Sequence, residues 1–452
     1  DKQRLIAWLY SGNGEANIIV GTRSAIFTPF KNLGLIIIDE EHDVSFKQQE
    51  GFRYSARDVA IKRAFELNIP IILGSATPSA ESYHNALIKK YCLIELTERA
   101  GNAHPPLFKL INMPTHKMEN GLAKETIQYI KHHLEKKEQV LVFINRRGYA
   151  PAWFCQSCYW QADCPRCDSY MVLHKKKRQL VCHHCGHQIA MPTICPKCQS
   201  KSLIALGEGT QRIEETLSQL FPNVNLYRID RDNIKNKHQL EEHLNDIQHQ
   251  DAALLIGTQM LAKGHHFPNV TLVVMLGLDH GLMSHDFYAL ERTAQLILQV
   301  SGRAGREAKQ GTALLQTIQP EHPQLLGLIQ HPYGVFLNEL LKERQQFDLP
   351  PFTFMALFRS EAKQMQKAID CLEKIQAWLN KNNEKKIATI YDPIAAPMQR
   401  KAGFYHMQLL IRSPNRRLLH ALLRQTLADI SQQQGERLSA RWSLDVDPIA
   451  LY

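Results

Sequence analysis

Eight of the ten cysteines in this chain form four CxxC pairs within one short window, residues 155–198. Four thiolates from two such pairs can hold one tetrahedral Zn²⁺, so the window predicts two closed structural zinc sites. A nested pairing (first pair with fourth, second with third) and a crossed pairing both fit the spacing. The four pairs are Cys155/Cys158, Cys164/Cys167, Cys182/Cys185 and Cys195/Cys198.

The cysteine window is also basic, which favours contact with a nucleic acid or with an acidic partner tail. The alternative is that zinc serves only to hold the segment together. The clustering of the pairs, in a sequence whose first residues show no signal peptide, favours reduced thiolates on metal over disulfides. Eight evenly paired thiols argue against a redox role, and Cys92 and Cys371 are predicted to be core residues. The interposed basic residues are His174, Lys175, Lys176, Lys177, Arg178, His183 and His184.

The length and the charge limit the class of protein. A chain of 452 residues is long enough for about three domains. The formal net charge of +10 favours a polyanionic partner, with a generic basic surface as the alternative. No stretch approaches the roughly 20 continuous apolar residues of a membrane span, so no membrane partner is expected.

Strands alternate with helical patterns on both sides of the cysteine window, which predicts parallel α/β sheets. The patterns resume after the window, so the window is predicted to be an insertion. The strands are expected at residues 17–20, 35–38, 69–73, 140–144, 225–229, 253–256 and 270–276. The helices are expected at residues 56–67, 123–137, 210–220 and 286–304.

The last hundred residues have a different pattern, in which strands and helices follow the order βαββαβ. This order is consistent with an α+β, ferredoxin-like domain. We therefore expect four segments. They are a first α/β lobe at 1–112, a second lobe at 113–345, the cysteine module at 151–205 within it, and a C-terminal domain at 346–452.

An acidic segment, Asp39-Glu40-Glu41-His42, follows one predicted strand directly, and Gly74-Ser75-Ala76-Thr77-Pro78 follows another. Both lie at the carboxyl ends of strands, where open α/β sheets bind ligands. Asp39 would hold Mg²⁺ through its hydration shell, and Glu40 would orient or deprotonate the attacking water in nucleotide hydrolysis. A lone acidic pair is more often a solvated turn, but the second segment favours the hydrolytic interpretation. Ser75 and Thr77 can hydrogen-bond the acidic loop.

A second group of residues is predicted to contact phosphates. Arg303 and Arg306 lie three apart on a predicted helix, with Gln299 one turn earlier, and could serve as arginine fingers. A surface basic patch is the alternative for this pattern. The remaining residues of the group are Gly257, Thr258, Lys263 and Gly302.

Aromatic and cationic residues interleave between the two strand-end segments, a pattern suited to single-stranded nucleic acid because bases stack on rings while cations meet phosphates. Ordinary core aromatics are the alternative. A strand-end phosphate contact is also expected shortly after residue 20. The DNA-binding candidates are these residues together with Lys263 of the preceding group: Thr22, Arg23, Phe46, Lys47, Phe52, Arg53 and Tyr54.

The motifs DEEH, GSATP, NRRGY, GTQMLAKGHHF and QVSGRAGR, with the cysteine pairs between the third and the fourth, resemble the bacterial primosomal protein N-prime family, the replication-restart helicases (PriA). The resemblance implies two RecA-like parallel-sheet helicase lobes, nested zinc pairing, and an aromatic-rich loop near residues 43–58 that couples DNA to hydrolysis. It implies an ATP-dependent 3′-to-5′ DNA helicase of superfamily two that recognises stalled forks and D-loops and initiates primosome assembly. The implied cofactors are two Zn²⁺ and ATP with Mg²⁺.

The resemblance also implies partners and a cellular setting. The implied partners are forked and single-stranded DNA, the single-strand DNA-binding protein, primosome proteins and the loader of the replicative helicase, at the nucleoid in the bacterial cytoplasm. A G-x-x-x-x-G-K-[ST] phosphate loop does not occur in the sequence. We expect that loop, with further N-terminal domains, upstream of Asp1, so the chain alone should be deficient in ATP hydrolysis.

Two other functions are compatible with parts of the pattern. A non-catalytic, zinc-dependent primosome loader or scaffold would use only the cysteine module and the C-terminal domain. A RecQ-type helicase would also carry zinc, but its zinc site follows the second lobe, whereas here the cysteines interrupt it. ATP hydrolysis with and without forked DNA separates the helicase from the scaffold.

Overall fold

The structure is a computed structural model of the chain, and it divides into two compact units. One unit comprises residues 1–93 with 447–449, and the other comprises residues 94–446 with 450–452. The structure describes residues 2–451 except 97–104, 116–117, 146–151, 156, 159, 161, 168–169, 175–177, 183–184, 207–208, 231–233, 235–236, 259–260, 262–266, 268, 285, 306–309 and 433–437.

The first unit is built around two parallel strands, β1 (Ile36–Ile38) and β2 (Ile71–Leu73). Ser55 caps the helix between them, α2 (Ala56–Leu67), because its Oγ accepts the Asp58 N–H at 3.2 Å. Buried alanines of α2 pack against the isoleucines of β1. The other elements are α1 (Lys2–Asn13), η1 (Arg23–Phe27), η2 (Val44–Phe46) and α3 (Ala80–Leu87).

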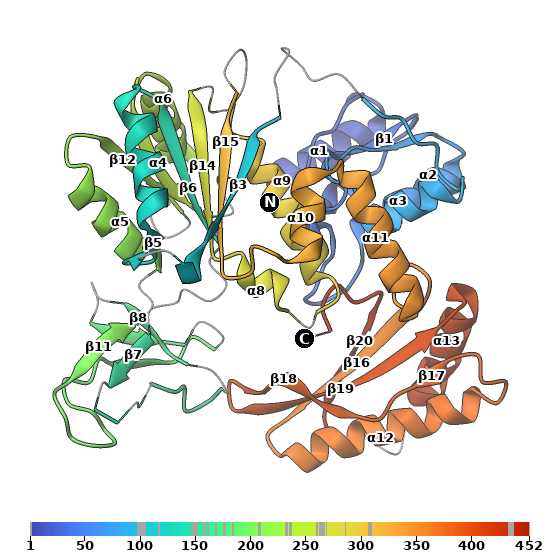
Figure 1. The fold of residues 1–452 in the computed structure, drawn as a ribbon. Helices are drawn as coiled ribbons and strands as arrows, with labels where there is room; N and C mark the ends of the chain where they lie inside the picture. The colour runs from blue at the N-terminus through green and yellow to red at the C-terminus, as the bar shows by residue number, and fades with distance from the viewer. Residues whose placement is uncertain are drawn as a thin grey trace. The chain divides into compact units, whose positions relative to one another are not determined.

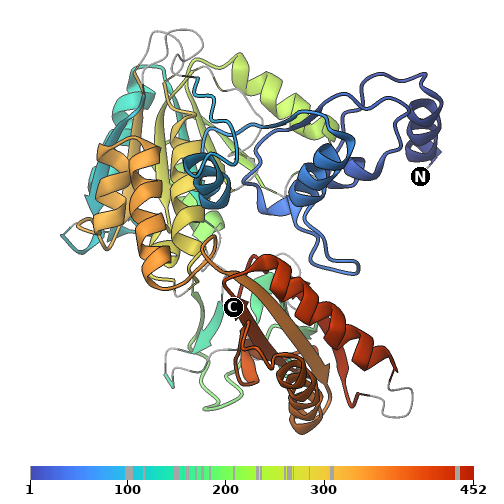
Figure 2. The same ribbon diagram turned by 90° about the vertical axis from the view of Figure 1, so that its right-hand side faces the viewer.

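The second unit contains a six-stranded parallel sheet in the order β12-β13-β6-β14-β15-β3 (Figures 1 and 2). Every residue of its three central strands is buried, as continuous apolar runs require in a sheet that is covered on both faces. The strands are β3 (Leu107–Asn112), β6 (Gln139–Ile144), β12 (Asn225–Ile229), β13 (Ala253–Gly257), β14 (Val270–Leu276) and β15 (Thr312–Thr317).

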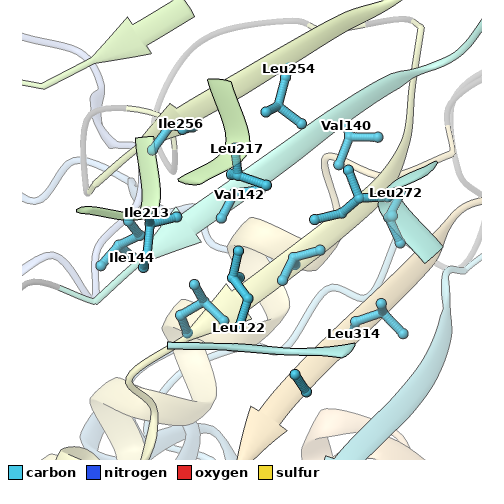
Figure 3. Packing of buried hydrophobic residues seen from close by; sticks show 14 of the residues in the cluster. Leu122, Val140, Val142, Ile144, Ile213, Leu217, Leu254, Ile256, Leu272 and Leu314 are labelled. Carbon is cyan, nitrogen blue, oxygen red and sulfur yellow. The ribbon is translucent and has the colours of Figure 1, made fainter. Parts of the chain in front are cut away.

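Helices cover this sheet, and Figure 3 shows part of the core that results. Ile213 and Leu217 of one helix pack with Val142 and Ile256 of the strands. The helices are α4 (Lys124–Glu135), α5 (Gly209–Leu220), α6 (Lys237–Gln248), α8 (Asp279–Leu282), α9 (Ala289–Ser301), α10 (Pro323–Gln330) and α11 (Tyr333–Gln346). A short η4 (Met113–Thr115) and the hairpin β4 (Met118–Glu119) and β5 (Leu122–Ala123) precede α4.

The cysteine module is an antiparallel sheet in the order β10-β9-β8-β7-β11. It begins after β6 and ends before α5, so it interrupts the parallel sheet in sequence, as predicted. Its strands are β7 (Ala152–Cys155), β8 (Val172–His174), β9 (Gln179–Val181), β10 (Gln188–Ala190) and β11 (Leu203–Leu206).

The C-terminal domain is an antiparallel sheet in the order β17-β19-β16-β20, with two helices that share its core. Numbered within the βαββαβ pattern this order is 2-3-1-4, that of a ferredoxin-like fold, as predicted. One further strand, β18, was not predicted and pairs with β19. The elements are β16 (Phe354–Ala362), α12 (Met365–Asn382), β17 (Thr389–Ile390), β18 (Ile394–Lys401), β19 (Phe404–Ser413), α13 (Arg416–Gln432) and β20 (Arg441–Val446).

Four sequence predictions differ from the structure. Residues 17–20 form no strand, and Ile18 and Val20 are 82% and 94% exposed, because no described strand pairs with them. The helix predicted to run to residue 304 ends at Ser301, where Gly302 caps it. Cys92 is exposed rather than a core residue, whereas Cys371 is buried as predicted. Residues 107–112, placed in the first lobe from the sequence, form β3 and pair with β15 of the second unit.

The part of the chain that the structure describes contains no helix long and apolar enough to span a lipid bilayer.

Candidate nucleotide site and metal centres

The acidic turn of the first unit follows β1 immediately, as the sequence predicted. The side chains of Asp39 and Glu40 are exposed, and Asp39 Oδ1 accepts the Glu40 N–H at 3.0 Å. Glu40 has a φ of +50°, a left-handed conformation that is uncommon for residues other than glycine and costs on the order of 1 kcal/mol or more. Strain of this kind clusters at functional sites. Exposed carboxylates suit a hydrated Mg²⁺.

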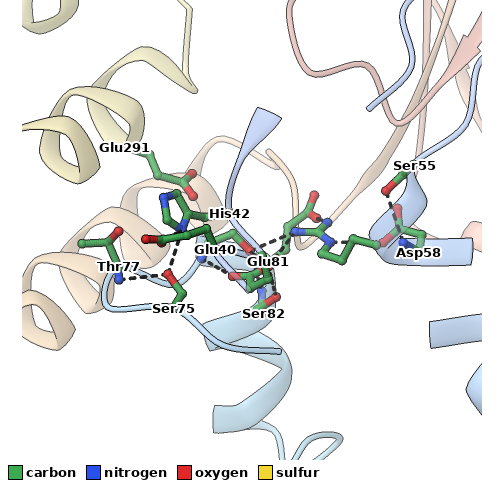
Figure 4. Close-up of polar contacts among 12 residues, drawn as sticks. Glu40, His42, Ser55, Asp58, Ser75, Thr77, Glu81, Ser82 and Glu291 are labelled. Atoms are coloured by element: carbon green, nitrogen blue, oxygen red, sulfur yellow. Dashed lines mark hydrogen bonds and ion pairs between the residues drawn. The ribbon is translucent and has the colours of Figure 1, made fainter. Parts of the chain in front are cut away.

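The second predicted segment lies beside the acidic turn, because β1 and β2 are adjacent and parallel. The Glu41 N–H donates to the Gly74 carbonyl at 3.1 Å. Figure 4 shows the side-chain link, in which His42 Nδ1 and Ser75 Oγ are 2.7 Å apart. Ser75 Oγ in turn accepts the Thr77 N–H at 3.0 Å. The structure therefore joins the two segments by hydrogen bonds.

Glu41 has a different environment from its two acidic neighbours. It is 2% exposed, and its carboxylate accepts hydrogen bonds from Ser79 N at 2.7 Å and Ser82 Oγ at 2.8 Å. These bonds fix the start of α3, which Ser79 caps. Arg57 Nη1 completes the set at 3.1 Å. Glu41 is therefore shielded from solvent, and it positions the segment that follows Thr77.

Arg57 sits at the start of α2 and binds three carboxylates. Its Nη2 lies 2.6 Å from Glu81 and its Nε lies 3.3 Å from Asp58, in addition to the contact with Glu41. Burial opposes its charge, yet Glu81, Asp58 and Glu41 together raise the pKa of Arg57 well above its ordinary value. Because α2 begins directly after the aromatic-rich loop, Arg57 connects that loop to the acidic turn and to α3. Arg57 was not predicted from the sequence, since an arginine in a helical pattern usually lies on the surface.

Replacing Arg57 with alanine should destabilise the first unit by about 3 kcal/mol, because it leaves the carboxylates that Arg57 binds without their positive partner. Native-state hydrogen exchange of the α2 amides should accelerate on the order of 100-fold, since each ~1.4 kcal/mol is a factor of ten. Lys62→Ala is the matched control on the same helix, where an exposed pair with Glu66 at 3.0 Å contributes little. Equal exchange in the two variants would contradict the role of Arg57.

The aromatic-rich loop borders a cavity of about 420 Å³. Phe52 is 79% exposed at this cavity, and Tyr54 beside it packs edge-on against Phe27 with ring centroids 4.9 Å apart. Arg23 Nη1 donates to the carbonyls of Ser45 and Lys47 at 3.0 and 3.2 Å, so it holds the loop in place. The lining residues are Thr22, Arg23, Ser24, Gln48, Glu50, Gly51, Phe52 and Tyr54.

The structure therefore separates the predicted DNA-binding residues into two groups. Thr22, Arg23, Phe52 and Tyr54 meet at the cavity. Phe46 packs against the core of the first unit and Lys47 is buried. Arg53 Nε donates to the Gln49 carbonyl at 2.8 Å, within the loop. Phe46 and Lys47 are thus placed to support the loop rather than to meet a base.

In the second unit, the predicted phosphate contacts lie at the ends of β13 and α9. Gly257 ends β13, and a Cβ there would approach the Ile229 carbonyl oxygen to 2.5 Å, so only glycine fits. Thr258 follows and is buried. Gln299 lies on α9, Gly302 caps it, and Arg303 lies beyond its end.

Arg303 and Arg306 were predicted to lie on one face of a helix. The helix prediction is wrong at Arg303, because α9 ends at Ser301 and Gly305 has a φ of +69°. Arg306 and Lys263 themselves lie outside the described residues.

The eight cysteines form two clusters with nested pairing, the first of the two alternatives. In each cluster the four Sγ atoms lie within 4.8 Å of one another. Cys155–Cys198 and Cys158–Cys195 Sγ atoms are both 3.6 Å apart, and Cys164–Cys185 are 3.7 Å apart. A tetrahedron with Zn–S bonds of about 2.3 Å has S–S edges of about 3.8 Å, whereas a disulfide is about 2.05 Å. The clusters therefore fit zinc. Their members are Cys155, Cys158, Cys195 and Cys198 in the first, and Cys164, Cys167, Cys182 and Cys185 in the second.

The two clusters differ in their surroundings. In the first, Cys198 is exposed. In the second, Cys164 and Cys167 are 3% and 2% exposed and form a small core with apolar residues of the module. Burial raises the pKa of the Cys167 thiol to about 12, while a backbone N–H of Ala402 acts in the opposite direction. A metal ion would hold these sulfurs as thiolates in spite of their burial.

Three family models match the chain in the order of its domains. They are a DEAD/DEAH box helicase over residues 1–86, a PriA DNA helicase Cys-rich region domain over residues 164–189 and a primosomal protein N C-terminal domain over residues 345–449. The chain is also 37% identical to the replication restart protein PriA of Rickettsia conorii over 441 residues, which cover 97% of this chain and 67% of that protein. The chain belongs to the PriA family.

Other PriA proteins give the same result. The chain is 46% identical to the replication restart protein of Haemophilus influenzae over 449 residues and 38% identical to that of Bacillus subtilis over 445 residues. The matches cover 99% and 98% of this chain, but 61% and 55% of those PriA proteins. The chain thus spans little more than half the length of these relatives. The resemblance seen in the motifs is confirmed, and a helicase-family nucleotide site and zinc-binding cysteine clusters agree with it.

Proposed function

We propose that the whole protein, at the length of its PriA relatives, is an ATP-dependent 3′-to-5′ DNA helicase that recognises stalled forks and D-loops and initiates primosome assembly. One arrangement in the first unit carries the proposal. The exposed Asp39 and Glu40 belong to a turn that is hydrogen-bonded to the Ser75–Thr77 segment through His42, and to α2 through Glu41 and Arg57. Hydrolysis coupled to DNA movement needs such a connection between the acidic turn and a DNA-binding loop.

In this proposal each carboxylate of the turn has one role. Asp39 holds the hydrated Mg²⁺ of the nucleotide, and Glu40 orients or deprotonates the attacking water. Arg303 and Arg306 stabilise the charge that develops on the phosphate. Bound Mg²⁺ would supply further neutralisation of the phosphate oxygens. The residues that connect this chemistry to the lobes would be Glu41, His42, Ser75, Thr77, Gly257, Thr258, Gln299 and Gly302.

The chain by itself should be deficient in ATP hydrolysis, because its sequence contains no G-x-x-x-x-G-K-[ST] phosphate loop. Hydrolysis is therefore to be tested in the whole protein. We propose forked and single-stranded DNA, single-strand DNA-binding protein, primosome proteins and a helicase loader as its partners. The net charge of +10 supports DNA among these partners.

The role of the aromatic-rich loop can be tested in the chain itself. Phe52→Ala should raise the dissociation constant for a fluorescent oligothymidine about tenfold at fixed salt, since one base–aromatic stack is worth about 1–3 kcal/mol. Phe65→Ala is the matched control, because Phe65 is also 79% exposed but does not line the cavity. Fluorescence anisotropy gives both constants, and a Phe65 effect as large as that of Phe52 would contradict base stacking at the loop.

The second candidate is a non-catalytic loader or scaffold built on the zinc module and the C-terminal domain. The module's separate sheet and its own small core favour this candidate. The two functions are distinguished by DNA-stimulated ATP hydrolysis in the whole protein, which a scaffold would lack.

A further inference from the structure

The second cysteine cluster is contacted by a hairpin of the C-terminal domain, and both lie within the second unit. The hairpin joins β18 to β19 through the two residues Ala402 and Gly403. The Ala402 N–H donates to Cys167 Sγ at 3.0 Å, and the Gly403 N–H donates to the Arg166 carbonyl at 2.7 Å. A residue 235 positions away in sequence thus donates directly to a predicted zinc ligand.

Two arginines add hydrogen bonds to the same contact, one from the C-terminal domain and one from the cysteine module. Arg400 Nη2 donates to the Pro165 carbonyl at 2.7 Å, and Arg166 Nη2 donates to the Ala402 carbonyl at 3.3 Å. Met398 of β18 packs against the core of the module. Four hydrogen bonds and an apolar contact therefore join the hairpin to residues 165–167.

The conformation of the hairpin is adapted to this contact. Ala402 and Gly403 have φ values of +55° and +82°, as a two-residue type I′ turn requires. Alanine is a poor residue for the first of these positions, because its Cβ disfavours the left-handed region. The positive φ of Ala402 is thus maintained by its surroundings, and it directs the N–H at the sulfur.

The chemistry of the sulfur explains why such a donor matters. A thiolate bound to zinc carries negative charge, and hydrogen bonds from an outer shell stabilise it. Cys167 is 2% exposed, so water has little access to supply these bonds. Cys198 of the first cluster is exposed, and among the described residues no hydrogen bond joins the C-terminal domain to that cluster.

We infer that the β18–β19 hairpin is an outer-shell component of the second zinc site, and that metal bound there fixes the C-terminal domain to the cysteine module. The first site has no such role. Zinc loss from Cys164, Cys167, Cys182 and Cys185 releases the hairpin, and loss from the first cluster leaves it in place. This inference does not depend on the proposed helicase activity.

Hydrogen exchange of the zinc-loaded chain tests whether a change in the metal ligands affects the hairpin. Cys164→Ser/Cys167→Ser should accelerate exchange of the Ala402 and Gly403 amides at least about tenfold, because loss of the metal disorders residues 165–167, which carry both acceptors, Cys167 Sγ and the Arg166 carbonyl. Cys155→Ser/Cys158→Ser is the matched control and should change them less than about twofold. The amides of Leu409 and Ile411, which are fully buried in the C-terminal core, should be unchanged in both variants. Equal protection of the hairpin in the two double variants would overturn the inference.

The rate of zinc release tests whether a change in the hairpin affects the second metal site. Arg400→Ala should accelerate transfer of one of the two zinc ions to a colorimetric chelator on the order of tenfold, as loss of an outer-shell contact does at other metal sites. Lys401→Ala, an exposed neighbour on the same strand, should leave both release rates as in the parent. Identical release from the Arg400 variant and the parent, or faster release of both ions, would contradict a hairpin that supports the second site alone.

Discussion

Replacing Glu40 with glutamine in the whole protein should reduce DNA-stimulated ATP hydrolysis on the order of 10³-fold, the scale that a positioned general base contributes. Glutamine keeps the size of the side chain but cannot accept a proton from water. Glu40 is exposed beside His42, whose Nδ1 lies 3.6 Å from its carboxylate, so the change removes little packing. DNA binding should survive. The measurement is the steady-state rate of phosphate release at saturating DNA.

A matched control for that comparison lies in the same unit. Glu66→Gln changes an exposed carboxylate of α2 that pairs with the exposed Lys62 at 3.0 Å. It should leave hydrolysis within about twofold of the parent, since surface pairs of this kind contribute little. If Glu40→Gln retained hydrolysis within about tenfold of the parent, the catalytic role of Glu40 would be wrong.

Removing Cys164 and Cys167 together, as Cys164→Ser/Cys167→Ser, should lower the zinc content from two ions per chain to one and unfold the module around the second site. Structural zinc supplies about 10–16 kcal/mol of apparent binding free energy, which in small domains is folding free energy. The core of this module is small, and the cysteines themselves form part of it. The six-stranded sheet has its own fully buried strands and should remain folded.

The same variant separates two activities of the whole protein. DNA-stimulated hydrolysis should largely remain, and unwinding or partner recruitment should fail. Cys92→Ser, which changes an exposed cysteine outside both clusters, should keep two zinc ions and both activities. One zinc ion in the parent, or equal loss of hydrolysis and unwinding in the double variant, would be incompatible with a separable module of two zinc sites.

The parallel sheet was predictable where strands are buried on both faces. β14 has the bounds that its apolar run indicated, because a continuous apolar run suits a strand that is buried on both faces. The bounds predicted for β12 also match, although β12 lies at the edge of the sheet and only Ile229 in it is buried. β3 and β18 were missed because neither is a continuous buried run: Ile111 is the one buried residue of β3, and no residue of β18 is buried. β18 also contains Pro397, and its register with β19 shifts between Ala395 and Arg400, as is typical of a proline in an edge strand.

The candidate sites were predictable where chemistry depends on local spacing. The CxxC pairs predicted the two four-cysteine clusters, and the strand ends brought the acidic turn beside Gly74 and Ser75. The pairing of the cysteines followed from resemblance, since the spacing alone fits two arrangements. Arg57 and the hydrogen bond from Ala402 to Cys167 were not predictable, because each depends on a tertiary contact in which one partner, Arg57 or Ala402, lies outside every motif.

If the acidic turn belongs to a DNA-dependent motor, the unmutated whole protein must hydrolyse ATP faster when DNA is bound. The measurement is the rate of ATP hydrolysis by the whole protein with and without forked DNA, at fixed salt. We expect slow hydrolysis without DNA, stimulation by forked DNA, and loss of the stimulated rate in Glu40→Gln. Tight binding of forked DNA with no stimulated hydrolysis by the parent would contradict the motor and favour the scaffold.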